Sequence, residues 1–258
     1  MNAGFIGHGR VATAFAKFLN SKGVCVSGFH TRSSPNPEAI NNCDIVFIAT
    51  PDDQIAHVAA EAKSNAKFFC HFSGALPSKV LLPLKKEGVT VASLHPAMTF
   101  TENTSLDNVI YTVEGDGDGF EELLKFFDSL GIRHIKIDSD SKAMYHAALC
   151  NVSNHIATLV YMTVEMLKKL HIDEKDCFSI IAPLATAALK NALDMGPKAA
   201  LTGPISRGDV NTVKSHMPHV DEVYLALAEK TVDLAYEAGK IDIIKADEIR
   251  EVLSYGSN

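Results

Sequence analysis

The sequence predicts an α/β domain with a doubly wound, mainly parallel sheet, followed by an all-α domain. Two observations carry this prediction. Strand-like and helix-like segments alternate from the first residues to about residue 137. Pro and Gly are then absent from residue 139 until Pro183, and only helical patterns follow. We therefore expect one domain over residues 1–139 and an all-helical domain over residues 140–258.

Length and composition are consistent with two soluble domains. A chain of 258 residues is long enough for each domain to bury its own core. The balance of 24 basic against 31 acidic residues gives a net charge of -7, which argues against a nucleic-acid partner. No apolar run approaches the ~20 residues that a membrane span needs. The five cysteines are scattered and include no Cys-x-x-Cys pair, as expected of reduced thiols in a cytoplasmic protein.

The first 19 residues have the pattern strand, glycine turn, helix. A short apolar strand, residues 3–6, leads into Gly7-x-Gly9-x-x-Ala12, and apolar residues then recur at helical spacing. Gly7 permits a tight turn, Gly9 lets a pyrophosphate approach the main chain, and Ala12 lets the helix pack closely on its strand. The helix N-terminus would then face the phosphates. A glycine turn of this kind also occurs for structural reasons alone, but its position predicts a Rossmann-type dinucleotide site.

The segment after the second strand indicates which dinucleotide binds. An NAD site places an Asp or Glu at the end of this strand, expected here at residues 24–29, to bind the adenosine ribose. The first acidic residue of this chain is Glu38, and the strand is followed instead by Thr31-Arg32-Ser33-Ser34. A guanidinium flanked by hydroxyls suits a 2′-phosphate. We therefore predict NADP(H), the alternative being a solvated basic turn.

Further strands are expected at residues 44–49, 67–72, 89–94, 110–113 and 132–137. Helices are expected to begin near residue 52 and to span 76–84 and 120–130, with an acidic turn over 114–119. Ligands of such sheets bind at the carboxyl ends of the strands. Thr50 and Pro51 are therefore expected beside the nicotinamide ribose, whereas Ser73 and His95 would orient the substrate or the carboxamide.

The second half should contain helices at 142–170, 173–195, 208–216, 219–239 and 245–254. Lys142 and His146 are four residues apart and share a helix face near the start of the first helix. A second polar cluster, Thr202 to Asp209, lies in a loop broken by Gly and Pro. Each of these residues has a structural alternative: a solvated lysine, a core histidine, or an Arg207–Asp209 bridge.

The sequence gives little support for metal-dependent or acyl-transfer chemistry. The histidines include no His-Glu-x-x-His pattern, and the pair His216-Met-Pro-His219 is a weak metal signal. A Gly-x-Ser-x-Gly nucleophile motif is also missing. We expect no metal.

The ordered series of motifs resembles a family of uncharacterised NADP oxidoreductases. In that family a Rossmann-like domain precedes a helical domain of unknown function. The series comprises the glycine turn, Asp44-x-Val-Phe-Ile-Ala-Thr-Pro-Asp52, Ser73-Gly74, Ser93-Leu-His95-Pro96, Lys142-x-x-Tyr145-His146, Ser153-Asn154 and Leu-Thr202-Gly-Pro204-x-x-Arg207-Gly208-Asp209.

The architecture is also similar to pyrroline-5-carboxylate reductase, ketopantoate reductase and the 6-phosphogluconate and β-hydroxyacid dehydrogenases. The resemblance implies a helical domain of the 6-phosphogluconate dehydrogenase C-terminal type. In the 6-phosphogluconate and β-hydroxyacid dehydrogenases a Lys-x-x-x-Asn pair lies at the start of the long helix, and the lysine acts as proton donor or base. Here Lys142 matches that lysine, but His146 replaces the asparagine.

These observations predict an NADPH-dependent reductase of a small carbonyl or imine compound. An NADP(H)-binding sensor without catalysis is the alternative, and an S-adenosylmethionine methyltransferase is a weaker one. The candidate catalytic residues are Lys142, His146 and His95, and the candidate substrate-pocket residues are Asn154, Thr202, Arg207 and Asp209. The candidate cofactor-binding residues are Gly7, His8, Gly9, Arg10, Val11, Thr31, Arg32, Ser33, Thr50, Pro51 and Ser73. The apolar helices of the second half, and the pairing of related reductases through this domain, lead us to expect a homodimer.

Overall fold

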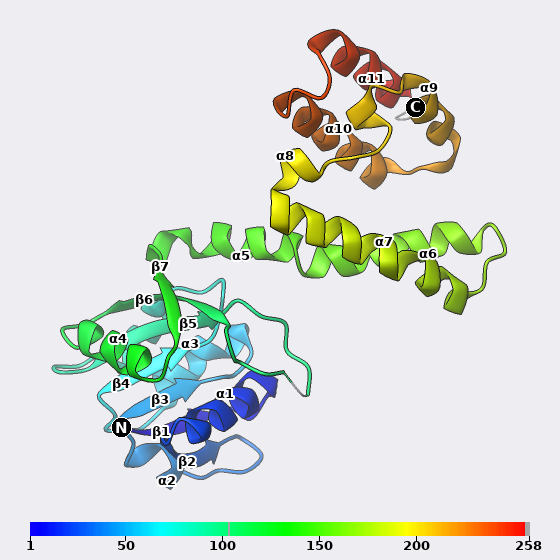
Figure 1. The fold of residues 1–258 in the computed structure, drawn as a ribbon. Coiled ribbons are helices and arrows are strands. Elements are labelled where there is room, and N and C mark those ends of the chain that lie inside the picture. Colours follow the sequence, from blue (N-terminus) through cyan, green and yellow to red (C-terminus); the bar gives the residue numbers. More distant parts are fainter. Residues whose placement is uncertain (103, 256–258) are drawn as a thin grey trace. The chain divides into compact units, whose positions relative to one another are not determined.

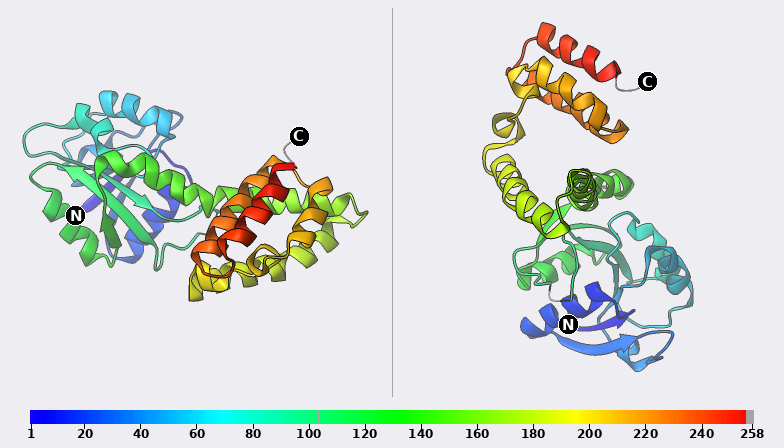
Figure 2. Two further views of the ribbon diagram at one scale, coloured as in Figure 1. Left: turned by 90° about the horizontal axis from the view of Figure 1, so that it is seen from above. Right: turned by 90° about the vertical axis from the view of Figure 1, so that its right-hand side faces the viewer.

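The computed structural model describes residues 1–102 and 104–255. The chain divides into two compact units, the first unit (Met1–Thr158) and the second unit (Leu159–Asn258). Figures 1 and 2 show the elements of both. The secondary structure changes from α/β to helical after residue 138. The first unit nevertheless continues to Thr158, because the helix that follows packs on the sheet through Lys142.

The first unit is a seven-stranded sheet with helices on both faces. Its strands are β1 (Asn2–Ile6), β2 (Cys25–His30), β3 (Ile45–Ile48), β4 (Phe68–His71), β5 (Thr90–Pro96), β6 (Ile110–Asp116) and β7 (Arg133–Lys136). The helices between them are α1 (Arg10–Ser21), α2 (Glu38–Asn41), α3 (Asp52–Glu61), the 3₁₀ helix η1 (Ser78–Leu84) and α4 (Phe120–Ser129). After β7 come the 3₁₀ helix η2 (Ser139–Ser141) and α5 (Lys142–Asn151).

The strand order is β2-β1-β3-β4-β5-β6-β7, and every neighbouring pair is parallel except β5 with β6. This confirms the predicted doubly wound, mainly parallel sheet. The apolar sequence of β3 and of the first three residues of β4 is explained by their burial on both faces of the sheet. The register of β1 with β3 aligns Ile6 with Ile48, so their carboxyl ends meet at one edge of the sheet.

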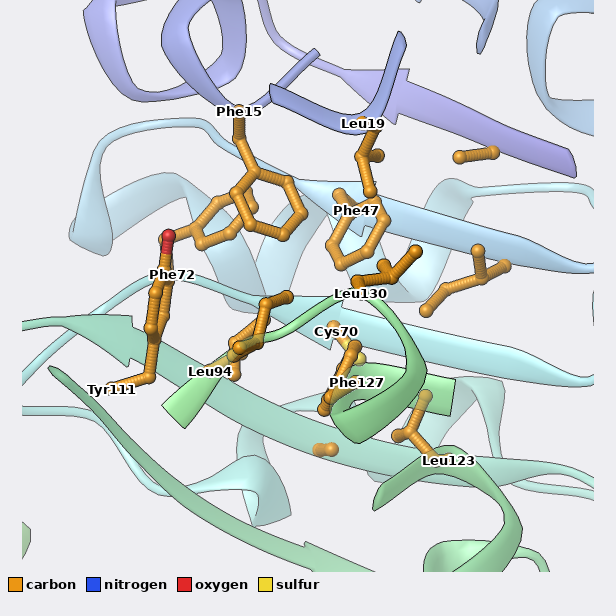
Figure 3. Close-up of a cluster of buried hydrophobic side chains, with 14 of the residues drawn as sticks. Phe15, Leu19, Phe47, Cys70, Phe72, Leu94, Tyr111, Leu123, Phe127 and Leu130 are labelled. Atoms are coloured by element: carbon orange, nitrogen blue, oxygen red, sulfur yellow. The ribbon is translucent and has the colours of Figure 1, made fainter. Parts of the chain in front are cut away.

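Two hydrophobic clusters cover the two faces of this sheet. In the cluster of Figure 3, Phe15 and Leu19 of α1 pack over Phe47 of β3, and Phe127 of α4 packs beside Cys70. On the other face α2, α3 and η1 contribute residues such as Ile40, Ile55 and Leu81. The helices therefore hold the strand ends in a fixed array.

Three expected elements differ from the structure. The segment 76–84 forms the 3₁₀ helix η1 and includes Pro83, which has no N–H to donate. The acidic turn expected from residue 114 begins later, because β6 extends to Asp116 and buries Glu114. The helix expected over 142–170 is broken after Asn151.

The break between α5 and α6 (Asn154–Lys168) lies at residues 152–153. The Ser153 hydroxyl donates to the Leu149 carbonyl oxygen at 2.8 Å, and the Ser153 N–H bonds Cys150 O instead of Leu149 O. A serine side chain that bonds the preceding turn competes with the helical ladder, which explains the interruption.

The second unit is helical, and α6 spans the border between the units. Its further elements are α7 (Glu174–Met195), α8 (Pro197–Ala200), η3 (Ile205–Arg207), α9 (Val210–His216), η4 (Met217–His219), α10 (Glu222–Glu237) and α11 (Ile243–Tyr255). Helices α9, α10 and α11 bury a common apolar cluster that includes Val213, Val232 and Ile249.

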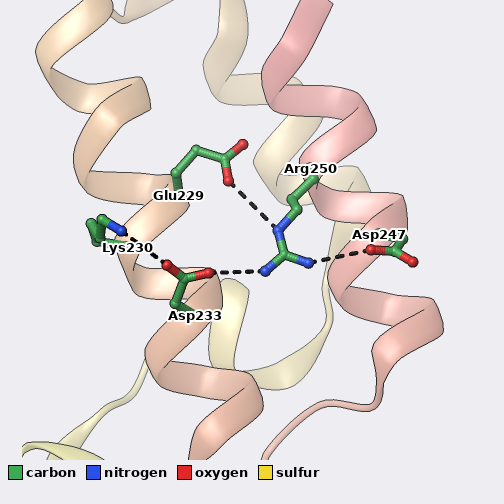
Figure 4. Close-up of polar contacts among 5 residues, drawn as sticks. All are labelled: Glu229, Lys230, Asp233, Asp247 and Arg250. Atoms are coloured by element: carbon green, nitrogen blue, oxygen red, sulfur yellow. Dashed lines mark hydrogen bonds and ion pairs between the residues drawn. The ribbon is translucent and has the colours of Figure 1, made fainter.

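Charged side chains also link α10 to α11 (Figure 4). Arg250 of α11 contacts Asp233 at 2.9 Å and Glu229 at 3.7 Å on α10, and it contacts Asp247 at 3.2 Å on its own helix. These pairs are partly exposed, so the apolar cluster contributes most of the packing energy.

Candidate functional site

A cavity of about 870 Å³ lies at the carboxyl ends of β1, β2 and β3. Its lining comes from the turn after β1, the segment after β2, the segment after β3, and α3 with its C-terminal flank. The lining residues are Ile6, Gly7, His8, Gly9, His30, Thr31, Arg32, Pro37, Ile40, Asn41, Ala49, Thr50, Pro51, Gln54, His57, Val58, Glu61, Ala62 and Lys63.

The two glycines of the first turn are needed for different reasons. Gly7 has φ +101°, and a Cβ there would lie 2.5 Å from the Ala49 carbonyl oxygen, so the fold itself requires glycine. A Cβ on Gly9 would meet no atom within 4 Å. Gly9 precedes α1, whose N-terminus has no side-chain cap. This end of the cavity therefore combines open space with helix N–H groups, which suits an anion.

Two further features of the lining are polar. The Thr50 hydroxyl is buried without a hydrogen-bond partner among the described residues, and a bound ligand would satisfy it. The lining also contains Arg32 and Lys63 but a single carboxylate, Glu61, which lies 3.3 Å from His57. The cavity is thus suited to a ligand with negative charge.

The remaining cofactor candidates lie outside this lining, as the structure describes it. Arg10 donates to the Phe100 carbonyl oxygen at 3.5 Å, and Val11 packs against the core. The Ser33 hydroxyl lies 3.3 Å from the Thr31 hydroxyl, which also accepts from the Ser34 N–H at 2.9 Å. Thr31 therefore organises the loop that presents Arg32.

A second set of polar residues surrounds Lys142, at the start of α5. The Lys142 side chain is 1 % exposed, and its Nζ donates to the Ser73 carbonyl oxygen at 2.9 Å and to Ser93 Oγ at 2.5 Å. Burial lowers its pKa to about 8, although the charges of Glu114 and Asp52 oppose the shift. Lys142 is thus a buried group held against the ends of β4 and β5.

Sequence reasoning missed the carboxylates near this lysine. Buried Glu114 accepts from the Ser78 N–H at 2.5 Å and from the Ser78 hydroxyl at 2.7 Å. Asp52 accepts from the Ser73 hydroxyl at 2.7 Å. Neither bonds Lys142 directly, so the lysine has opposite charges nearby but is hydrogen-bonded to neutral oxygens. The glycines that follow Glu114 in the sequence favour a turn, whereas the residue lies in β6.

His71 is a further buried histidine that the sequence did not single out. Its Nδ1 accepts from the Ser73 N–H at 3.1 Å, which leaves Nε2 as the protonated nitrogen, 3.3 Å from the Pro77 carbonyl oxygen. Burial and the charge of Lys142 lower its pKa to about 3. His71 is therefore a neutral structural histidine.

His95 and His146 come together beside Gly74. The His95 and His146 rings lie 6.2 Å apart, and His95 Nδ1 lies 2.9 Å from the Tyr145 hydroxyl. A Cβ on Gly74 would lie 2.6 Å from His146 Cδ2 and 2.8 Å from His95 Nε2, so only glycine fits between them. Burial and the charges of Lys142 and His146 lower the pKa of His95 to about 4. All three expected catalytic residues thus belong to the first unit.

The four substrate-pocket candidates divide between the units. Asn154 opens α6 in the first unit and accepts from the Ser153 hydroxyl at 3.0 Å. Thr202, Arg207 and Asp209 belong to the second unit, where Asp209 caps α9 by accepting from the Thr212 N–H at 3.1 Å and the Thr212 hydroxyl at 2.6 Å. Their part in a substrate pocket stays a prediction.

Residues 109–231 match a domain of unknown function, DUF2520. This match covers just under half of the chain. This region begins at β6 and includes Glu114, Lys142, Tyr145 and His146, whereas the glycine turn and His95 precede it. No curated protein matched the chain.

Solved structures resemble the whole chain. A candidate NADP oxidoreductase from Bacteroides fragilis is 20% identical with a TM-score of 0.68, covering 97% of this chain and 98% of that one. A Thermotoga maritima protein is 24% identical with a TM-score of 0.68, covering 99% and 100%. Plasmodium falciparum pyrroline carboxylate reductase with NADP bound is 11% identical with a TM-score of 0.58, covering 98% of each. At these identities the likeness establishes the fold alone: a Rossmann-like α/β domain followed by a helical region.

Two features are absent from the part of the chain that the structure describes. No helix there is long and apolar enough to cross a membrane. No group of three or more His, Cys, Asp or Glu side chains is placed there to hold a metal ion.

Proposed function

We propose that this chain is an NADP(H)-dependent oxidoreductase that reduces a small carbonyl or imine compound. The observation that carries the proposal is the cavity at the ends of β1, β2 and β3. The cavity contains a glycine turn at the N-terminus of α1, with open space beside Gly9. It also contains the Thr50 hydroxyl, which has no hydrogen-bond partner among the described residues. Arg32 lies in the segment where an NAD site carries a carboxylate.

The cavity residues fit the parts of a phosphorylated dinucleotide. Gly7, His8 and Gly9, with the first N–H groups of α1, would hold the pyrophosphate. Arg32 would bind the 2′-phosphate, with the Thr31 hydroxyl holding the loop in place. The Thr50 hydroxyl would bond the nicotinamide ribose beside Pro51.

The comparisons support the same cofactor class. One protein of this fold is described as a candidate NADP oxidoreductase, and another holds NADP. NADP(H) is therefore the first nucleotide to test with this chain.

The chemistry would be completed by residues at the ends of β4 and β5. NADPH, when bound, supplies the hydride. His95 and His146 are partly exposed and flank Gly74, so we propose that they contact the substrate. Lys142 is buried and bonded to Ser73 and Ser93, so we propose that it acts through its charge. Asn154, Thr202, Arg207 and Asp209 remain proposed substrate contacts.

We further propose a cytoplasmic homodimer. All five cysteines are free thiols in the structure, as in a reducing compartment. The dimer would form through the second unit, where α7 exposes much of its apolar surface.

The test is turnover of NADPH against a panel of small ketones, aldehydes, 2-oxo acids and cyclic imines, with product identified by mass spectrometry. The proposal expects NADPH-dependent reduction of at least one class. Gly9→Val serves as the control, because it keeps the proposed catalytic residues and obstructs the proposed pyrophosphate site. NADPH binding without turnover on any class would favour a nucleotide sensor, and absence of binding would contradict the proposal.

A further inference from the structure

One ring nitrogen of His95, Nδ1, is hydrogen-bonded to another side chain of the protein. Nδ1 lies 2.9 Å from the Tyr145 hydroxyl, and the two rings meet edge to face with centroids 5.6 Å apart. Tyr145 is on α5, one turn after buried Lys142, whose hydrogen bonds to Ser73 and Ser93 fix the helix on the sheet. The phenol is therefore held at a fixed place beside the end of β5.

The direction of this hydrogen bond follows from the chemistry of the two groups that form it. Burial raises the pKa of Tyr145, so its hydroxyl keeps its proton. A protonated phenol donates to the lone pair of a neutral imidazole nitrogen more strongly than its oxygen accepts from an imidazole N–H, so we assign Tyr145 as the donor to Nδ1 of His95.

A hydrogen bond accepted by Nδ1 places the proton of neutral His95 on Nε2. The neutral form is favoured because the burial of His95 and the positive charge of Lys142 both lower its pKa. Nε2 lies beside Gly74, where a Cβ would come within 2.8 Å of it. Within the described residues no hydrogen bond occupies Nε2, so this N–H is free to donate.

We propose that Tyr145 is a positioning residue that holds His95 as the Nε2–H tautomer, and that His95 is the group that donates a hydrogen bond to the carbonyl oxygen or imine nitrogen of the substrate. The role of His95 toward the substrate rests on the proposed function, whereas the tautomer of His95 is independent of it. A neutral donor polarises the substrate without carrying a positive charge into the site.

The first experiment reads the tautomer directly. Long-range ¹H–¹⁵N spectra of the uniformly labelled protein at neutral pH should show His95 with Nε2 protonated and Nδ1 as a hydrogen-bonded acceptor. In Tyr145→Phe the Nδ1 resonance should lose its hydrogen-bonded shift, and the Nδ1–H tautomer should become detectable. Nδ1–H as the main form in the unmodified protein, or an Nδ1 signal unchanged by Tyr145→Phe, would overturn the proposal.

The second unit provides a matched control. There the Tyr224 hydroxyl lies 2.9 Å from His216 Nδ1, with ring centroids 6.1 Å apart and planes at 85°, almost the same geometry as the pair above. Tyr224→Phe removes the same hydroxyl from the same kind of pair. It should change the His216 signals and leave those of His95 in place.

A second readout applies once a substrate is found. Tyr145→Phe should lower kcat by about threefold to tenfold, the effect of one positioning hydrogen bond, with the Kd for NADPH within twofold. His95→Ala should lower kcat further than Tyr145→Phe. Unchanged kcat in Tyr145→Phe would overturn the catalytic part even if the tautomer changes. If no substrate is turned over, the proposed function fails and the spectra alone decide the role of Tyr145.

Discussion

At the scale of single residues, the two glycines of the first turn have different roles. Gly7 is needed for folding, and Gly9 is proposed to make room for the cofactor. Gly7 is required by its positive φ and by the Ala49 carbonyl oxygen, whereas nothing in the protein fills the space beside Gly9. We predict that Gly7→Ala costs about 1–3 kcal/mol of stability. Gly9→Ala should change stability by less than about 0.5 kcal/mol and weaken NADPH binding at least tenfold. Urea unfolding and NADPH fluorescence titration measure both, and normal NADPH affinity in Gly9→Ala would contradict the pyrophosphate assignment.

Lys142 predicts a pH dependence of stability. Its pKa is about 8 in the folded protein and near 10.5 when unfolded, so below pH 8 both states are protonated and the cost of the buried charge is fully present. Between these pKa values the unfolded chain binds more protons, and the stability contributed by this residue rises with pH by about 1–3 kcal/mol.

The measurement compares the unfolding free energies of the wild type and Lys142→Met from pH 7 to about pH 10, since the other titrating groups cancel in the difference. The unfolding free energy of the wild type should increase relative to that of Lys142→Met as the pH rises. A difference independent of pH would mean that Lys142 is not a buried titrating group.

The residue scale is also where sequence reasoning was least complete. Seven of the expected cofactor residues line the cavity, because a glycine turn and the residues after parallel strands have a fixed place in such a fold. Partial desolvation of Lys142 follows from its place at the start of the helix that leaves the sheet, whereas its nearly complete burial, at 1% exposed, does not follow from the sequence. Its surroundings include Glu114 and Asp52, and sequence spacing does not indicate that three distant segments meet at one point.

At the scale of elements, every expected strand is present because each is a short apolar run bounded by turn residues. The errors lie where local chemistry overrides the pattern. Gly115 suggested a turn, but it continues β6 because its missing side chain leaves room for the Phe120 ring. Ser153 has a side chain that interrupts a helix which apolar spacing alone would continue.

Helix α9 provides a prediction at this scale. Asp209 caps it through Thr212, and these hydrogen bonds lower the pKa of the Asp209 carboxyl. Asp209→Ala should lower the melting temperature, and Asp209→Asn should restore part of the loss because asparagine also caps helices. Stability contributed by the carboxylate is present above its unfolded pKa and is lost as the pH falls through the folded one. Unchanged melting in Asp209→Ala together with lost turnover would instead support a direct role in the substrate pocket.

At the scale of the whole molecule, the apolar surface of the second unit predicts self-association. Helix α7 has 22 residues and buries only Cys177 and Ile181, whereas Leu184 and Leu193 are 72% and 76% exposed. Light scattering at micromolar concentration should give the mass of a dimer, which Leu184→Glu with Leu193→Glu should reduce to that of a monomer. Ile135→Glu, at an exposed position of β7 in the first unit, is the control and should leave the dimer intact. A monomeric wild type would contradict the prediction.

The central claim is that the cavity of the first unit binds NADP(H), and competing titrations with NADPH and NADH test it most directly. NADPH should bind at least tenfold more tightly, a difference of ~1.4 kcal/mol. Arg32→Ala should remove most of this preference and leave NADH binding nearly unchanged, whereas Arg133→Ala, at an exposed position of β7 outside the cavity, should preserve it. Equal affinities of the unmodified protein for NADPH and NADH would contradict the account.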